Sequence, residues 1–186
     1  MILLQKQKLV LVTPPHTASG ALHKILCSPE HGGIWVNGEN PDGGIDHHYG
    51  RVHDGWIHDG YKVILVIREP LARVYGLYKH YLWWLEKEGL KHDIPFDSYL
   101  NAPPNHYMHT ETQLEFYTRN NLDDCDTEVV STTNIDDVLD FDYGINILPA
   151  FDHTALLCDL DREAKTLPDT QRWKDEVNFW KYYGAI

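Results

Sequence analysis

Lys62-Val-Ile-Leu-Val-Ile-Arg-Glu-Pro70 is a continuous apolar run that ends at a charged pair and a proline. A run without polar alternation is typical of a strand buried on both faces in a parallel sheet. Pro70 suits the first turn of a helix. Apolar side chains then recur at helical spacing, at Leu71, Val74, Tyr75, Tyr78, Tyr81, Leu82 and Leu85. We therefore predict a strand over 62–67 and a helix from Pro70 to about Glu88.

A second stretch of the same kind lies nearer the N-terminus, at Lys8-Leu-Val-Leu-Val12. Thr13-Pro14-Pro15 ends this predicted strand. A helix is predicted from near Ser19 or Gly20, because apolar residues follow at i, i+3 and i+4. Residues 28–60 are rich in Gly, Asp, Asn and His, which predicts a long irregular excursion.

The rest of the chain continues this alternation. Thr110-x-x-Gln113 has the spacing of a capping box that opens a helix, and Glu128-Val-Val-Ser131 is a candidate third strand. Trp173, Val177 and Trp180 indicate a C-terminal helix. Strands separated by helical segments predict an α/β fold, with a parallel sheet flanked by helices. A chain of 186 residues is expected to form one domain over 1–186.

Composition excludes several classes of protein. At 42% hydrophobic and 24% charged, the chain lies in the ordinary globular range. No apolar run reaches the about 18 residues of a membrane span, and Lys6 interrupts the apolar N-terminus, so no secretory leader is expected. Cys27, Cys125 and Cys158 are too few and too widely spaced for a disulfide framework. These features favour a cytoplasmic protein without a membrane span.

The net charge of −12 is unevenly distributed along the chain. Residues 1–91 hold ten Lys and Arg against nine Asp and Glu, whereas residues 92–186 hold six against nineteen. Neither half carries the basic stripe or the motifs of a nucleic-acid-binding protein, so no nucleic-acid partner is expected. The near-neutral first half could still bind a small anion where its basic groups converge.

Thr13-Pro-Pro-His-Thr-Ala-Ser-Gly-Ala-Leu22 joins the first predicted strand to its helix. Small residues in such a turn aim backbone N–H groups and the positive end of the helix dipole at one point, where a phosphate fits. An ordinary turn between a strand and a helix fits the spacing equally well. The absence of G-x-x-x-x-G-K-[ST] from the sequence disfavours an ATP- or GTP-dependent kinase.

Arg68 is a second candidate for binding an anion. It follows the second predicted strand, and ligands in open α/β sheets bind at the carboxyl ends of the strands, where the first loop also lies. Its planar guanidinium can donate two parallel hydrogen bonds to a phosphate. Arg73 could point at the same site or could equally lie on the helix surface, paired with Glu69.

Together the two segments resemble the anion-binding loops of the sulfotransferase superfamily, whose members use 3′-phosphoadenosine 5′-phosphosulfate (PAPS). The family's first loop, P-K-x-G-[ST]-[ST], is similar to the loop that begins at Pro15. Its second, R-[DN]-P-x-x-R-x-x-S-x-Y, is matched at Arg68, Pro70, Arg73 and Tyr78, with Glu69 a conservative variant. Residues 46–51 resemble the segment with the family's acceptor-side histidine. Residues 147–154 are a fainter match to a later stretch of carbohydrate sulfotransferases.

The resemblance implies a P-loop NTPase-like architecture and transfer of a sulfuryl group from PAPS to a hydroxyl or amine, with release of adenosine 3′,5′-bisphosphate. It implies that the first loop holds the 5′-phosphosulfate, through Pro15, His16, Thr17, Ala18, Ser19, Gly20 and Ala21. Arg68 would hold the 3′-phosphate, and Arg73 belongs to the same cofactor site. The acceptor would be a small molecule or a carbohydrate, and the chemistry needs no metal.

Four positions depart from the family pattern. His16 replaces the catalytic lysine, Ala18 a glycine, Gly20 a hydroxyl residue and Gly76 a serine. A protonated imidazole at His16 could stabilise charge on the leaving oxygen, and an adjacent dianion would favour that protonation. The same departures fit a nucleotide-binding protein without transferase activity. A small-molecule kinase is the third alternative.

The acceptor must lose a proton, and His48 is the candidate base by its place in the resemblance, with His47 next. Both could instead be loop residues in a chain with twelve histidines. The histidines at 47, 48, 53 and 58 lack the spacing of known metal sites, so no metal is predicted. The tyrosines of the helix from Pro70 are expected to lie mostly in the core, whereas Trp83 or Trp84 could line an acceptor cleft.

Overall fold

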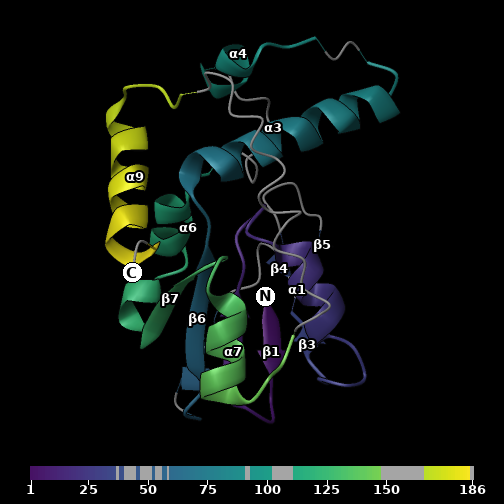
Figure 1. The fold of residues 1–186 in the computed structure, drawn as a ribbon, viewed down its shortest axis with the longest axis vertical. Coiled ribbons are helices and arrows are strands. Elements are labelled where there is room, and N and C mark those ends of the chain that lie inside the picture. Colours follow the sequence, from purple (N-terminus) through teal and green to yellow (C-terminus); the bar gives the residue numbers. More distant parts are fainter. Residues whose placement is uncertain are drawn as a thin grey trace.

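The computed structural model describes residues 1–36, 38–39, 45–46, 52, 56–57, 59–90, 93–101, 111–147 and 166–184. Within this part of the chain, a five-stranded sheet has the order β3–β1–β2–β6–β7 (Figure 1). Its strands are β1 (Ile2–Leu4), β2 (Leu9–Val12), β3 (Ile34–Trp35), β6 (Lys62–Ile67) and β7 (Thr127–Ser131). Two further short strands, β4 (Gly38–Glu39) and β5 (Ile45–Asp46), form a separate antiparallel pair.

The three strands predicted from the sequence, β2, β6 and β7, are parallel to one another. The prediction of a parallel sheet is wrong at one edge, because β1 pairs antiparallel with both β2 and β3 and the sheet is mixed. The cause is a tight turn over residues 5–8, in which the N–H of Lys8 donates to the Gln5 carbonyl at 3.2 Å. Such a turn returns the chain alongside β1, whereas a parallel neighbour needs a long crossover.

Helices cover the faces of the sheet, and α3 crosses the end at which β6 leaves it (Figure 1). The helices are α1 (Ser19–Leu26), α3 (Pro70–Lys87), α4 (Phe96–Asn101), α6 (Gln113–Arg119), α7 (Ile135–Tyr143) and α9 (Gln171–Gly184), with a 3-10 turn η2 (Leu122–Asp124). The predicted helices from Ser19, from Pro70 and at the C-terminus are confirmed. Among the described residues, no helix combines the length and the apolar character that crossing a membrane requires.

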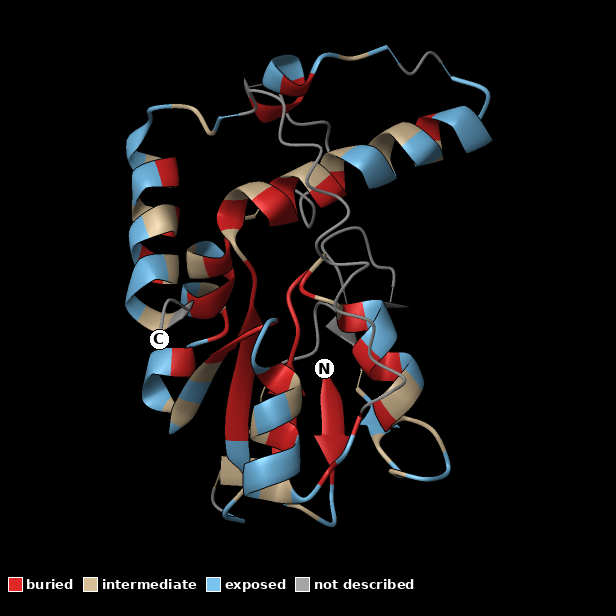
Figure 2. Ribbon diagram, viewed as in Figure 1, coloured by how far each residue is buried: buried red, intermediate tan, exposed pale blue. Residues whose placement is uncertain are grey.

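Alternate residues of the central strands pack into two different cores, which explains why these strands are apolar throughout. Leu9 and Ile64 pack on one face of the sheet with residues of α1 and α7. Their neighbours Val10 and Leu65 pack on the opposite face with residues of α6 and α9. A third cluster joins α3, α4 and α9. Figure 2 shows the result, buried central strands between helices whose outer sides are exposed.

The capping box of α6 differs from the prediction. The Thr112 hydroxyl accepts from the N–H of Glu115 at 3.0 Å, and Glu115 Oε2 accepts from the N–H of Thr112 at 2.8 Å. Thr110 lies outside the described residues. Gln113 is not a capping residue, because its side chain bonds to the backbone of Arg68 instead.

Candidate functional site

The loop between β2 and α1 closes as a tight turn at the carboxyl end of β2. Thr17 is fully buried, and its N–H and its hydroxyl both donate to the Pro14 carbonyl, at 3.3 and 2.7 Å. His16 and Ala18, on either side of Thr17, have φ values of +61° and +62°. Ala18 is the N-cap of α1 and provides no side-chain cap. The N-cap side chain therefore offers no acceptor to the first N–H groups of α1, a position at which proteins often bind an anion.

Ala18→Gly is expected to stabilise the protein by about 1 kcal/mol, because a residue with a Cβ is strained at positive φ. The free energy of unfolding in urea measures the gain. Ala21→Gly is the matched control: Ala21 lies within α1, where glycine is expected to cost about 0.5–1 kcal/mol. Equal destabilisation by the two substitutions would contradict the left-handed conformation at Ala18.

Arg68 lies at the carboxyl end of β6, beside this loop. It is 6% exposed, and its Nη1 donates to the His16 carbonyl at 3.4 Å. The structure thus brings together two predicted site residues that are 52 positions apart in the sequence. The contact follows from the topology, since β2 and β6 are adjacent parallel strands and end at the same edge of the sheet.

Arg73 is also bonded to the loop. It is 1% exposed, and its Nε donates to the Pro15 carbonyl at 3.0 Å. The alternative that Arg73 is a surface residue paired with Glu69 is therefore wrong. Burial lowers the pKa of the Arg73 guanidinium, and the charges of Glu176 and Glu111 oppose this shift.

Glu69 caps α3. Its carboxylate accepts from the N–H groups of Leu71 and Ala72, at 3.1 and 2.7 Å. A carboxylate at this end also complements the positive end of the helix dipole. The start of α3 is thus already occupied by an anionic side chain, whereas the start of α1 is not capped by its N-cap residue.

Gly76 makes room for His16 against α3. A Cβ at position 76 would lie 3.1 Å from His16 Nδ1 and 3.6 Å from Arg68 Nη1. The His16 ring also meets His80 edge-on, with 5.3 Å between ring centroids. Sequence reasoning missed His80, although its position one helical turn after Gly76 places both residues on the same face of α3. By contrast, a Cβ at Gly20 would meet no atom within 4 Å. Glycine at position 20 therefore lies beside open space and is not required by packing.

No protein-family model, curated protein or solved structure matches the chain.

Tyr78, matched to the family's second loop, lies in the aromatic core and not beside the first loop. Its hydroxyl donates to the Ile94 carbonyl at 2.5 Å, and its ring contacts Phe96 and Tyr99. Burial, followed by the effect of Tyr75, raises the pKa of Tyr78.

The structure describes only some of the residues that the sequence suggested for binding an acceptor. Trp83 is 52% exposed, and its ring lies 5.5 Å from that of His80. His47 and His48 lie outside the described residues, as do residues 148–154 of the fainter match. Among the residues that are described, no group of three or more His, Cys, Asp or Glu could hold a metal ion.

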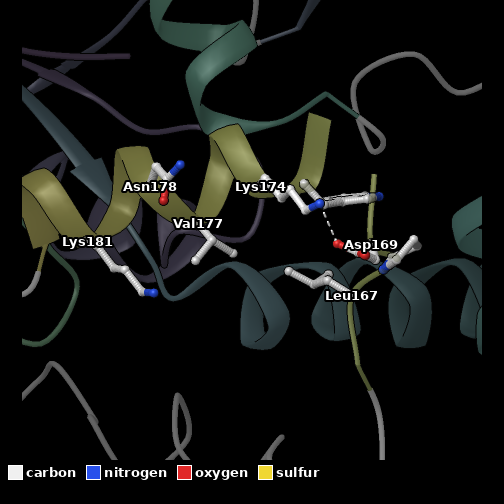
Figure 3. Close-up of a pocket in the computed structure, with 8 residues that line it drawn as sticks. Leu167, Asp169, Lys174, Val177, Asn178 and Lys181 are labelled. Carbon is white, nitrogen blue, oxygen red and sulfur yellow. Dashed lines mark ion pairs between the residues drawn. The ribbon is translucent and has the colours of Figure 1, made fainter. Parts of the chain in front are cut away.

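Two cavities lined by described residues lie away from the segment between β2 and α1 and away from Arg68. One, of about 420 Å³, lies beside α9 and includes the ion pair of Lys174 with Asp169, at 2.8 Å (Figure 3). The other, of about 740 Å³, is lined by Lys8 and Lys62 among others. These lysines lie at the amino ends of β2 and β6, the opposite end of the sheet from Arg68.

Proposed function

We propose that this protein transfers a sulfuryl group from PAPS to a hydroxyl or amine of a small-molecule or carbohydrate acceptor. The observation that carries the proposal is the contact between the two loops: Arg68 and Arg73 both donate to backbone carbonyls of the segment between β2 and α1. These are the segments that resemble the anion-binding loops of the sulfotransferases, and a P-loop-like architecture is part of the same proposal.

In this proposal, the N–H groups at the start of α1 and the Ser19 hydroxyl hold the 5′-phosphosulfate. Arg68 binds the 3′-phosphate through its guanidinium. Arg73 acts through the loop, because it is buried and its Nε is already bonded to Pro15. Cofactor binding thus depends on one arginine directly and on the other through the loop conformation.

The reaction requires two further groups. The acceptor oxygen or nitrogen attacks the sulfur, the bond from sulfur to the phosphate oxygen breaks, and His48 takes the acceptor's proton. His16, protonated, stabilises the negative charge that develops on the leaving phosphate oxygen. Adenosine 3′,5′-bisphosphate is then released.

Binding of the nucleotide without transfer is the second candidate function. It is favoured by the packing of His16, whose ring lies against α3 at Gly76 and against His80. An imidazole held there replaces the longer and fully charged lysine of the family. A kinase activity is disfavoured by the missing Lys-[ST] pair in the first loop.

Calorimetric titration of the protein with adenosine 3′,5′-bisphosphate, AMP and ATP–Mg²⁺ tests the proposal. Micromolar binding that requires the 3′-phosphate is the expected result, followed by turnover when PAPS is supplied with a panel of acceptors. The same binding without turnover would favour the second candidate. Failure to bind the bisphosphate, or tighter binding of ATP–Mg²⁺, would overturn both.

A further inference from the structure

One buried side chain, Gln113, holds both backbone groups of Arg68. Its Oε1 accepts from the N–H of Arg68 at 2.6 Å, and its Nε2 donates to the Arg68 carbonyl at 2.8 Å. Gln113 is fully buried at the start of α6. The amide therefore extends the hydrogen bonding of β6 by one residue beyond Ile67, at the point where the chain leaves the sheet for α3.

Glu176 of α9 fixes the orientation of that amide. Glu176 is fully buried, and its Oε1 accepts from the N–H and from the Nε2 of Gln113, at 3.0 and 2.9 Å. Its Oε2 accepts from the N–H of Leu114 at 3.0 Å. The Arg68 N–H can only donate, and the Glu176 oxygens accept at each of these contacts, so only the orientation with Oε1 toward Arg68 and Nε2 toward Glu176 satisfies both neighbours.

The same carboxylate acts on the second arginine of the site. Its charge is the largest of those that oppose the effect of burial on Arg73. Glu176 thus supports Arg68 through Gln113 and Arg73 through electrostatic attraction. A carboxylate on the C-terminal helix is in this way connected to both arginines that contact the first loop.

We propose that Gln113 and Glu176 are positioning residues that set the direction of the Arg68 side chain, and with it the preference of the site for a ligand with a second phosphate. The inference rests on the proposed function for its ligand. Its structural basis is independent of that function, because the Arg68 N–H is protected from solvent by Gln113 whether or not a nucleotide binds. A shift of about 1 Å in a binding group is enough to weaken recognition strongly.

The test compares Gln113→Met with the wild type in two measurements. Gln113→Met keeps the length of the side chain and removes both bonds to Arg68. We expect hydrogen exchange at the Arg68 amide to accelerate, and the ratio of affinities for adenosine 3′,5′-bisphosphate and AMP to fall about tenfold or more. Glu176→Gln keeps the shape of the Glu176 side chain and removes one acceptor oxygen. The same two quantities are measured for it, and it takes the place of Gln113→Met if that variant does not fold.

Arg172→Lys is the matched control. Arg172 joins the same two helices, through two hydrogen bonds to Glu115 at 2.7 and 2.6 Å. Lysine keeps the positive charge that acts on Arg73 and Glu176 but loses the paired hydrogen bonds to Glu115. Loosening the contact between α6 and α9 in this way should leave the ratio of affinities unchanged. A wild-type ratio in Gln113→Met, an equal fall in Arg172→Lys, or rapid exchange at Arg68 in the wild type would overturn the inference. Failure of the wild type to bind the bisphosphate, with the Arg68 amide still protected, would instead overturn the proposed function and leave the hydrogen bonding of Arg68 established.

Discussion

Replacing Arg73 with alanine is expected to lower the free energy of unfolding by about 3–5 kcal/mol, as is typical when one partner of a buried charge interaction is removed. The side chain is 1% exposed and bonds to the Pro15 carbonyl. Its loss leaves a cavity and a buried carbonyl without its donor. Unfolding in urea, followed by circular dichroism, measures the change.

Arg73→Met distinguishes the effect of Arg73 on the free energy of unfolding from its effect on the loop that binds the ligand. Methionine fills much of the volume and removes a charge that burial disfavours, so it should recover part of the stability. It cannot donate to Pro15, and the affinity for adenosine 3′,5′-bisphosphate should still fall about tenfold. Leu77→Ala, at a buried position of the same helix, is the control: it should cost about 2–5 kcal/mol and leave the affinity of the folded protein unchanged. Wild-type affinity in Arg73→Met would remove Arg73 from the site.

Arg68→Ala is expected to weaken binding of adenosine 3′,5′-bisphosphate by about 10- to 150-fold. This is the equivalent of the about 1.5–3 kcal/mol contributed by a hydrogen bond to a charged group. AMP lacks the 3′-phosphate, so its affinity should change little. Calorimetric titration of both ligands against the wild type and the variant gives, for each protein, the ratio of the affinity for the bisphosphate to that for AMP.

Lys174→Ala provides the charge-matched control for Arg68→Ala. Lys174 lies on α9 and is paired with Asp169 at 2.8 Å, so its removal subtracts the same charge from the protein at a place away from both loops. It reports the long-range electrostatic effect, which salt screens. An unchanged preference for the bisphosphate in Arg68→Ala, or the same loss in both variants, would exclude Arg68 from direct contact with the 3′-phosphate.

The central strands and the long helix could be predicted because their patterns are strong and local. β6 is apolar over consecutive residues, and α3 begins at a proline and continues with helical spacing. β1 and β3 were not predicted, since strands of three and two residues are too short to show a period. The antiparallel pairing of β1 with β2 depends on a turn over residues 5–8 that the sequence does not mark with glycine or proline.

The capping box shows how a local rule can be satisfied twice. Thr110-x-x-Gln113 and Thr112-x-x-Glu115 both fit the pattern, and only the fold decides between them. Gln113 is bonded to Arg68 and to Glu176, and its amide is therefore not available as a cap. Glu115 is free of that requirement and caps the helix.

The candidate site was predictable only in part. Adjacent parallel strands bring the first loop and Arg68 to one edge of the sheet, and this could be argued from the order of the elements. The contacts of Gln113 and Glu176 join residues 45 and 63 positions apart, and no spacing rule connects them. Such contacts arise from the packing of α6 and α9, which a single sequence does not encode in any local pattern.

The space at Gly76 links the residue at position 16 to the residue at position 76. A Cβ at position 76 would lie 3.1 Å from His16 Nδ1, so a larger residue there would press on the imidazole. Histidine at position 16 should consequently accompany glycine at position 76 in any sequence that shares this loop geometry. Any redesign that enlarges position 76 has to change position 16 as well.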